Sequence, residues 1–173
     1  MSCKLNYVKD KHGLHLLPFQ FYDKYNKISF PTMDKVPQVK NWPNLTKTVP
    51  QFYSNNNIAL LTGKVNNLTV LDIDTGGLEA WNKLLNGKEL NTPMVKTPGG
   101  LHVYFKYNST LKTSNRLYNR SINWDIRNDK GSIIAVPSII DGKRYKWVPD
   151  HSIEDKTLKK MPTWLEEFII SGY

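Results

Sequence analysis

The sequence predicts a single α+β domain. Several short apolar runs are typical of β-strands, two segments have helical spacing, and the two kinds of element follow one another without the regular order of a β-α-β fold. The chain has 173 residues, of which 39% are hydrophobic and 12% aromatic. This composition supports a packed core and excludes a disordered chain. We therefore expect one domain over residues 1–173, with one or two lobes.

The first half of the chain contains two clear strand patterns. Residues 58–62 and 68–73 are mainly apolar runs on either side of Gly63, and both have the length of a buried strand. Upstream, residues 13–19 form a shorter strand-like run. Prolines at positions 31, 37, 43 and 50 then interrupt a stretch in which we expect little regular structure.

Two helices are predicted in the second half. Residues 78–86 have apolar side chains at helical spacing, and Gly87 follows them as a typical helix end. Pro162 is suited to a first helical turn and starts a closing helix through residues 164–169.

Further strands are predicted around these helices. Residues 101–107 alternate between two faces, and residues 132–140 and 145–148 are also strand-like. Residues 108–121 are polar and basic, so we expect a loop or a mobile flap there.

The charge balance favours a polyanionic partner. The formal net charge is +9, and nucleic acids attract such a chain through sequence-independent phosphate contacts. A soluble, lysine-rich protein from an AT-rich genome would have the same balance, and the lysine and asparagine content indicates a virus or mobile element. Arginine is the preferred phosphate ligand, and the four arginines are confined to one segment: Arg116, Arg120, Arg127 and Arg144.

Several classes of protein are excluded by composition. Cys3 is the single cysteine, so an internal disulfide and a cysteine-based zinc cluster are ruled out. The sequence has no apolar run long enough to span a bilayer and no secretory signal near Met1. We expect a cytoplasmic protein, or one that acts in a nucleus or at a viral replication site.

Asp72 and Asp74 are the most informative residues. They end an apolar strand, and alternate residues of a strand point the same way, so the two carboxylates share one face while Leu71 and Ile73 point into a core. Neighbouring carboxylates repel each other unless a cation lies between them. Hard oxygen ligands favour Mg²⁺ or Mn²⁺.

A third acid, Asp125, belongs to a short strand in which it shares a face with Arg127. A lone aspartate is more often a turn or cap residue. Three carboxylates in basic surroundings, however, are what two-metal phosphoryl transfer requires, since one metal activates a hydroxyl and the other stabilises the leaving oxygens.

Two further segments are candidate phosphate contacts. His102 lies on the polar face of its strand, directly after the glycines at 99 and 100, which allow a backbone to approach a ligand closely. Lys64 follows Gly63 at a strand end, although the spacing is not that of a P-loop. The structural alternatives are a hydrogen-bonded surface histidine and an exposed lysine.

Five segments, in order, resemble the primase–polymerase domain of the archaeo-eukaryotic primase superfamily, which is found fused to helicases in plasmids, viruses and phages. The similarity runs from about residue 12 to about residue 150. The segments are a Lys-x-Pro stretch with a tryptophan (35–42), an Asn-Ile strand ending in Thr-Gly (57–63), Asp-x-Asp (72–74), Gly-Gly-x-His (97–105) and Asp-x-Arg with its following strand (125–138).

This resemblance implies a fold and a set of site residues. The fold would be the archaeo-eukaryotic primase fold, with an N-terminal αβ lobe packed on an RNA-recognition-like mixed or antiparallel sheet and the active site in the cleft. Asp72, Asp74 and Asp125 would bind the catalytic metals. The nucleotide-binding residues would be His102, Arg127, Lys64 and Gly100. Many superfamily members have serine at the last of these positions.

The expected function is template-directed nucleotidyl transfer by a DNA primase or polymerase. Expected partners are a single-stranded DNA template, a primer, an NTP or dNTP and a fused or associated helicase, and no membrane. Two alternatives stay open: a metal-dependent nuclease, for which Lys96 is a candidate accessory residue, and a catalytically silent DNA-binding module.

Overall fold

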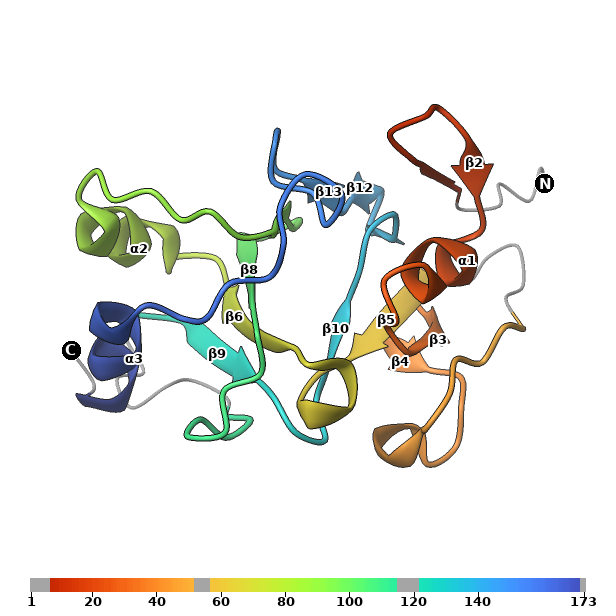
Figure 1. The fold of residues 1–173 in the computed structure, drawn as a ribbon, viewed down its shortest axis with the longest axis horizontal. Helices are drawn as coiled ribbons and strands as arrows, with labels where there is room; N and C mark the ends of the chain where they lie inside the picture. Colours follow the sequence, from red (N-terminus) through yellow and green to blue (C-terminus); the bar gives the residue numbers. More distant parts are fainter. Residues whose placement is uncertain (1–6, 52–56, 115–121, 172–173) are drawn as a thin grey trace.

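The computed structural model describes residues 7–51, 57–114 and 122–171. Two antiparallel β-sheets lie side by side, and helices cover the outer face of one of them (Figure 1). The mixed α+β class predicted from the sequence is therefore confirmed. The antiparallel sheets are consistent with a primase–polymerase fold.

The first sheet has four strands, in the order β10, β5, β3, β4. Their bounds are Ser132–Ile134, Asn57–Leu61, Ser29–Met33 and Val36–Pro37. Strand β5 is the expected strand at 58–62, and every one of its residues is buried.

The second sheet has five strands, in the order β13, β7, β8, β6, β9. Their bounds are Lys146–Trp147, Met94–Lys96, Leu101–Phe105, Thr69–Ile73 and Trp124–Arg127. Strand β6 is the expected strand at 68–73, and it pairs with both β8 and β9.

The remaining elements are two short hairpins and the helices. The hairpins are β1–β2 (Val8–Lys9, His15–Leu16) and β11–β12 (Ile139–Ile140, Lys143–Arg144). The helices are α1 (Pro18–Asp23), α2 (Leu78–Leu85) and α3 (Thr163–Ser171). None of the helices in the described ranges has the length and hydrophobicity needed to cross a bilayer.

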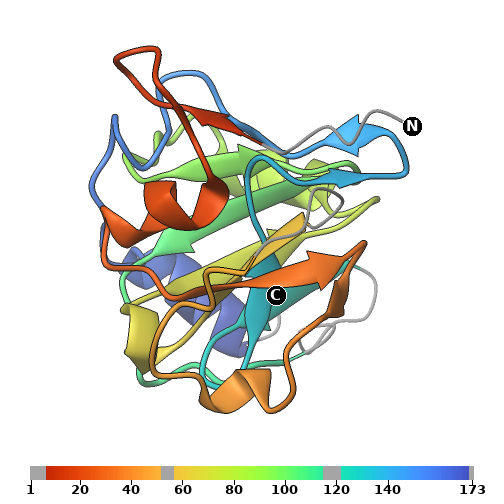
Figure 2. The ribbon, with the colours of Figure 1, turned by 90° about the vertical axis from the view of Figure 1, so that its right-hand side faces the viewer.

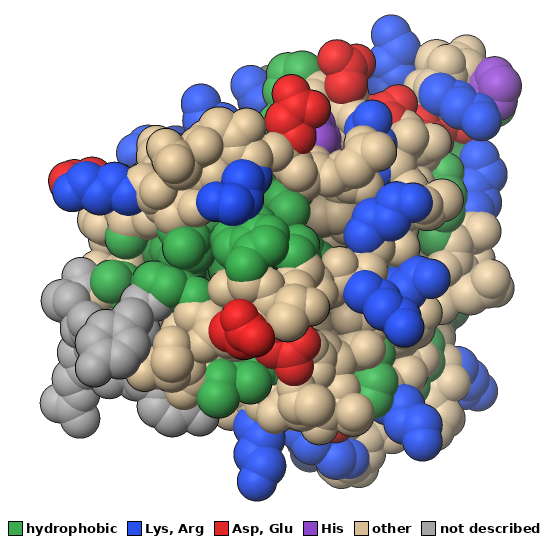
Figure 3. Space-filling model, turned by 60° about the vertical axis from the view of Figure 1, so that its left-hand side comes forward, with side chains coloured by type: hydrophobic (Ala, Val, Ile, Leu, Met, Phe, Trp, Pro, Cys, Tyr) green, Lys and Arg blue, Asp and Glu red, His purple; other side chains and the backbone are tan. Residues whose placement is uncertain are grey.

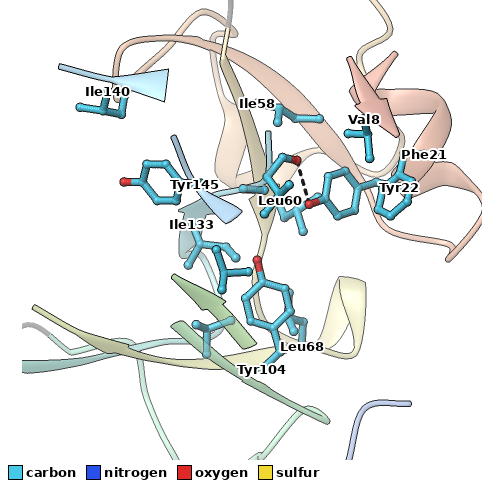
Figure 4. Close-up of a cluster of buried hydrophobic side chains, with 14 residues drawn as sticks. Val8, Phe21, Tyr22, Ile58, Leu60, Leu68, Tyr104, Ile133, Ile140 and Tyr145 are labelled. Carbon is cyan, nitrogen blue, oxygen red and sulfur yellow. Dashed lines mark hydrogen bonds between the residues drawn. The ribbon is translucent and has the colours of Figure 1, made fainter. Parts of the chain in front are cut away.

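Three apolar clusters hold the layers together. The first fills the space between the two sheets, where Leu60 of β5 and Tyr104 of β8 are both fully buried (Figure 4). The second joins α2 and α3 to the five-stranded sheet, with Leu71 and Ile73 pointing into it as predicted. The third covers the outer face of the four-stranded sheet. Figure 2 shows this sheet from its own side of the molecule.

Two N-terminal expectations need correction. The strand-like run at 13–19 is a strand only at β2 (His15–Leu16), and α1 follows because Pro18 occupies the first helical turn and the Gln20 side chain accepts a hydrogen bond from the Leu17 amide at 3.1 Å. The proline-interrupted stretch contains β3. Pro31 is tolerated there because its carbonyl accepts from Gln38 (3.0 Å). The Pro31 nitrogen, which carries no hydrogen, therefore faces the side of the short edge strand β4 and not β5.

The surface carries the expected positive charge. Figure 3 shows lysine and arginine side chains over much of one face, around a central area of apolar side chains. On this face, basic side chains are not confined to one patch.

Candidate active site

The pairing register of the five-stranded sheet brings the predicted acids together. Asp72 of β6 is directly opposite His102 of β8 on one side and Asp125 of β9 on the other. Side chains of paired residues stand next to each other on the same face. Asp74 follows two residues later on that face, and its amide donates to Asn123 O (3.0 Å), which fixes the strand end.

The three carboxylates form one cluster. Oxygen atoms of Asp72, Asp74 and Asp125 all lie within 4.8 Å of one another. Asp125 is buried, Asp72 is partly buried and Asp74 is exposed. The carboxylates therefore extend from the buried middle of the sheet to an open edge, as a site that receives ions or substrate from solvent requires.

Two basic side chains contact the inner pair of acids. Arg127 places Nη2 2.8 Å from Asp125 Oδ2 and Nε 3.6 Å from Asp72 Oδ2. His102 Nε2 lies 3.2 Å from Asp72 Oδ1, whereas its Nδ1 is buried with no hydrogen-bond partner among the described residues. Asp72 is thus held from both sides.

The surroundings shift the pKa values of the two β6 acids in opposite directions. Burial raises the pKa of Asp72, but the charges and hydrogen bonds of His102 and Arg127 outweigh burial and lower it overall. The pKa of Asp74 is raised, first by burial and then by the charges of Asp72 and Asp125. Without a bound cation, the cluster therefore disfavours a third negative charge.

The cluster opens into a cavity of about 400 Å³. Its walls come from both sheets: Asp72, His102 and Arg127 from one, residues 132–134 of β10 and the β3–β4 turn from the other. The predicted location of the site, in a cleft, agrees with this cavity.

Lys35 lies in the β3–β4 turn and lines the cavity. The turn is fixed at Asp34, which has a left-handed backbone (φ 49°) and whose carbonyl accepts from the Thr32 hydroxyl at 2.8 Å and from the side-chain Nδ2 of Asn57 at 3.4 Å. The sequence motif alone gave Lys35 no role. Its position in the structure adds a basic side chain to the cleft.

Tyr145 also lines the cavity, and the sequence did not indicate it. Figure 4 shows its ring at the edge of the inter-sheet cluster with the hydroxyl directed away from that cluster. Burial, with the charges of Asp72 and Asp74, raises the pKa of Tyr145 to about 12. The hydroxyl is therefore a neutral donor at physiological pH. No local motif marks such a residue, because long-range packing places it here.

Four predicted residues do not line the cavity, and one of them is the buried Asp125 of the carboxylate cluster. Lys64 is exposed, and its amide donates to Asp129 Oδ1 (2.9 Å). Gly100 is buried where a Cβ would lie 1.8 Å from Ile73 O, so this position permits close approach of β8 to β6. Lys96 of β7 is exposed outside the cavity lining.

The other arginines lie apart from this cavity or outside the described residues. Arg144 is exposed on β12 and donates to Pro137 O (3.1 Å). Arg116 and Arg120 fall in the undescribed part of the chain, together with the whole second half (115–121) of the expected flap at 108–121.

The donor set suits a hard divalent cation. Mg²⁺ and Mn²⁺ prefer carboxylate oxygens, and a cation would offset the repulsion from Asp72 and Asp125 that helps to raise the pKa of Asp74. Asp72, Asp74 and Asp125 could together hold such a cation.

The fold and site together define an antiparallel α+β domain with an acidic cluster suited to divalent metal, placed in a cleft between two sheets. The family model described as bifunctional DNA primase/polymerase, N-terminal, matches residues 5–164. The chain therefore belongs to this family, whose members are in general DNA primases and polymerases. A sequence comparison with curated proteins finds no match.

Proposed function

We propose that this domain is a template-directed nucleotidyltransferase that joins an NTP or dNTP to a 3′-hydroxyl, or to a first nucleotide during priming, and releases pyrophosphate. The observation that carries this proposal is the pairing of β6 with β9, which sets Asp72 and Asp74, both in the cavity lining, beside the buried Asp125. Family membership supplies the substrate class: DNA and nucleotides.

The three carboxylates would hold Mg²⁺ or Mn²⁺. Divalent ions at such a site lower the pKa of the attacking hydroxyl and neutralise charge on the leaving pyrophosphate. The chain's own task is to fix the carboxylates before substrate arrives. Arg127 and His102 do this for Asp72 and Asp125, while the end of β6 positions Asp74 toward solvent.

The cations of the cleft would bind the triphosphate. Arg127 and His102 stand beside the acids, and Lys35 extends from the opposite sheet. Fixed positive groups in a partly water-excluded cleft stabilise the charge that develops on transferred phosphate oxygens. Contact of His102, Arg127, Lys64 and Gly100 with nucleotide stays a prediction.

Isosteric amide variants test the proposal. Asp72→Asn and Asp74→Asn should reduce template-dependent incorporation at least about 10³-fold, because each removes a metal-binding charge. Asp141→Asn is the matched control, since Asp141 is exposed, has a left-handed backbone that asparagine accepts, and lies outside the cavity lining.

The assay should follow a labelled primer on a DNA template, with each nucleotide type, with and without Mn²⁺. Unchanged extension by both site variants would contradict the proposal. Shortening of the labelled strand in place of extension would identify the nuclease alternative. A fused or associated helicase remains a further expected partner.

A further inference from the structure

A second cavity lies far from the acids along the same strands. It has a volume of about 800 Å³ and is formed by the turn after α1, the residue after β8 and residues 153–160. We call it the lysine groove, after the basic residues that line it: Lys27, Lys106, Lys156, Lys159 and Lys160. A hollow of about 380 Å³ adjoins it and shares Lys106 and Lys160.

The lysine groove is fixed by backbone contacts to the sheet. The amide of Lys106 donates to Lys159 O at 2.8 Å, and Phe105 forms a parallel bridge with Lys159. The amide of Lys159 donates in turn to Thr92 Oγ1 (3.2 Å), next to β7. These lysines therefore project from an anchored segment that extends the sheet.

Within the described residues, the positive charges of the groove outnumber the negative charges near it, although Asp155 interacts electrostatically with Lys156. No carboxylate oxygen of that part of the chain lies within 4.0 Å of any of the five ammonium groups. Glu154 also lines the groove but is hydrogen-bonded to Tyr25. Lys27 is half-buried, and burial lowers its pKa, as expected for an ammonium group that lacks a nearby anion.

The rest of the groove is apolar and aromatic. Ile153, Leu158 and the Tyr25 ring are partly buried side chains of its lining. Apolar and aromatic surface flanked by cations is the combination that accepts single-stranded nucleic acid, because bases pack on the surface while phosphates meet the cations. The same three side chains also pack against the inter-sheet cluster.

We propose that the lysine groove is a second nucleic-acid contact, which binds single-stranded DNA outside the catalytic cleft. Lys106 follows His102 by four residues, so it stands roughly 13 Å along the strand from the site. The buried inter-sheet cluster, including Tyr104, separates the two cavities, which share no lining residue. This inference rests on the proposed function, since template-directed synthesis requires a bound strand.

The test compares two triple variants of equal charge. The first, Lys106→Gln with Lys159→Gln and Lys160→Gln, alters the groove. The second, Lys11→Gln with Lys40→Gln and Lys47→Gln, alters exposed lysines outside both cavities. Fluorescence anisotropy should measure binding of labelled oligo-dT of about 30 nucleotides over a salt series without divalent metal, after thermal melts show that both variants fold.

The groove variant should bind the oligonucleotide at least about tenfold more weakly, and its dependence of log K on log salt should flatten by about 2, because single strands give about 0.7 per phosphate contact. The control variant should bind as the wild type does. Equal affinities and slopes for the two variants would overturn the proposal. Binding of polyglutamate should be measured in the same way. If the groove variant lost binding to polyglutamate but kept binding to oligo-dT, the proposal would also be overturned, and the groove would be assigned to an acidic protein partner.

The outcome is separable from that of the proposed function. Extension of a short primer-template by the wild type, together with groove and control variants that bind oligo-dT alike, would remove the groove and leave nucleotidyl transfer standing. Absence of extension by the wild type, together with weaker oligo-dT binding by the groove variant, would remove nucleotidyl transfer and leave the groove standing.

Discussion

At the scale of single residues, Asp72 and Asp74 behave differently although they share one strand face. Asp72 is paired with Arg127 and His102, whereas the first effects on Asp74 are burial and two like charges. A folded-state pKa below the unfolded value contributes stability above the unfolded pKa, and that stability is lost as pH falls. A carboxyl group whose folded-state pKa is raised destabilises the folded state at neutral pH, and this destabilisation is lost as pH falls below the unfolded pKa.

This contrast predicts opposite stability effects in EDTA. At neutral pH, Asp74→Asn should raise the melting temperature, because it removes a carboxylate whose ionisation the folded state disfavours. Asp72→Asn should lower it, because Arg127 and His102 lose their charged partner. Differential scanning calorimetry gives both values.

Two controls sharpen this prediction. The stabilisation by Asp74→Asn should disappear as pH falls below about 3.8, the reference pKa, because Asp74 is then protonated in both states. Added Mn²⁺ should stabilise the wild type more than Asp74→Asn, since ligands that bind only the native state raise its stability. An Asp74→Asn variant that melts below the wild type in EDTA would contradict the charge account.

Lys35 supports a kinetic prediction. Lys35→Ala should raise KM for the nucleotide about tenfold, the loss expected for one charged contact to phosphate, with a smaller change in kcat. Lys40→Ala, an exposed lysine outside the cavity lining, is the control. Equal KM values for the two variants would show that the β3–β4 turn does not meet the substrate.

Residue chemistry was the part of the site most accessible from sequence. The spacing of Asp72 and Asp74 sufficed to place both on one face, and the alternation in residues 124–127 placed Asp125 and Arg127 together. Lys35 and Tyr145 were not assigned, because their approach to the acids depends on how the two sheets pack. Periodicity carries no information about that packing.

At the scale of elements, β6 is the organising strand. Its residues alternate between the helix-covered core and the cleft. Its two antiparallel neighbours supply His102 and Asp125 in register with Asp72. A register slip of one residue in β8 or β9 would turn these side chains to the opposite face.

Gly100 fixes where β8 meets the end of β6. Gly100→Ala should destabilise the domain by about 2 kcal/mol or more, because the added Cβ would collide with the rigid Ile73 carbonyl 1.8 Å away. Gly99→Ala should cost less, since its Cβ would meet the Thr75 hydroxyl, a side chain that can rotate. Equal urea midpoints for the two variants would contradict this role.

Strands and long helices were predictable, whereas the N-terminal elements were not. Strands β5, β6, β8 and β9 and helices α2 and α3 follow apolar periodicity. Helix α1 is only six residues long, which is too short to show a helical periodicity. Strand β3 was not predicted because it contains Pro31, whose missing N–H donor is tolerated on the side of the edge strand. In both cases tertiary context prevailed over local propensity.

At the scale of the whole molecule, the cleft depends on two sheets that meet through one apolar cluster. The acids stand on one sheet, while Lys35 and residues 132–134 belong to the other. The family resemblance led us to expect a site in a cleft, and that location stays a prediction. The charge balance of the chain suits a strand of nucleic acid bound across such a cleft.

The central claim is that the three clustered carboxylates hold the divalent ions used in nucleotide incorporation. Anomalous diffraction from crystals grown with Mn²⁺ and a non-hydrolysable dNTP analogue measures this directly. The account predicts Mn²⁺ peaks among the carboxylate oxygens of Asp72, Asp74 and Asp125. Mn²⁺ bound elsewhere, with these oxygens free of metal under conditions that support incorporation, would contradict it.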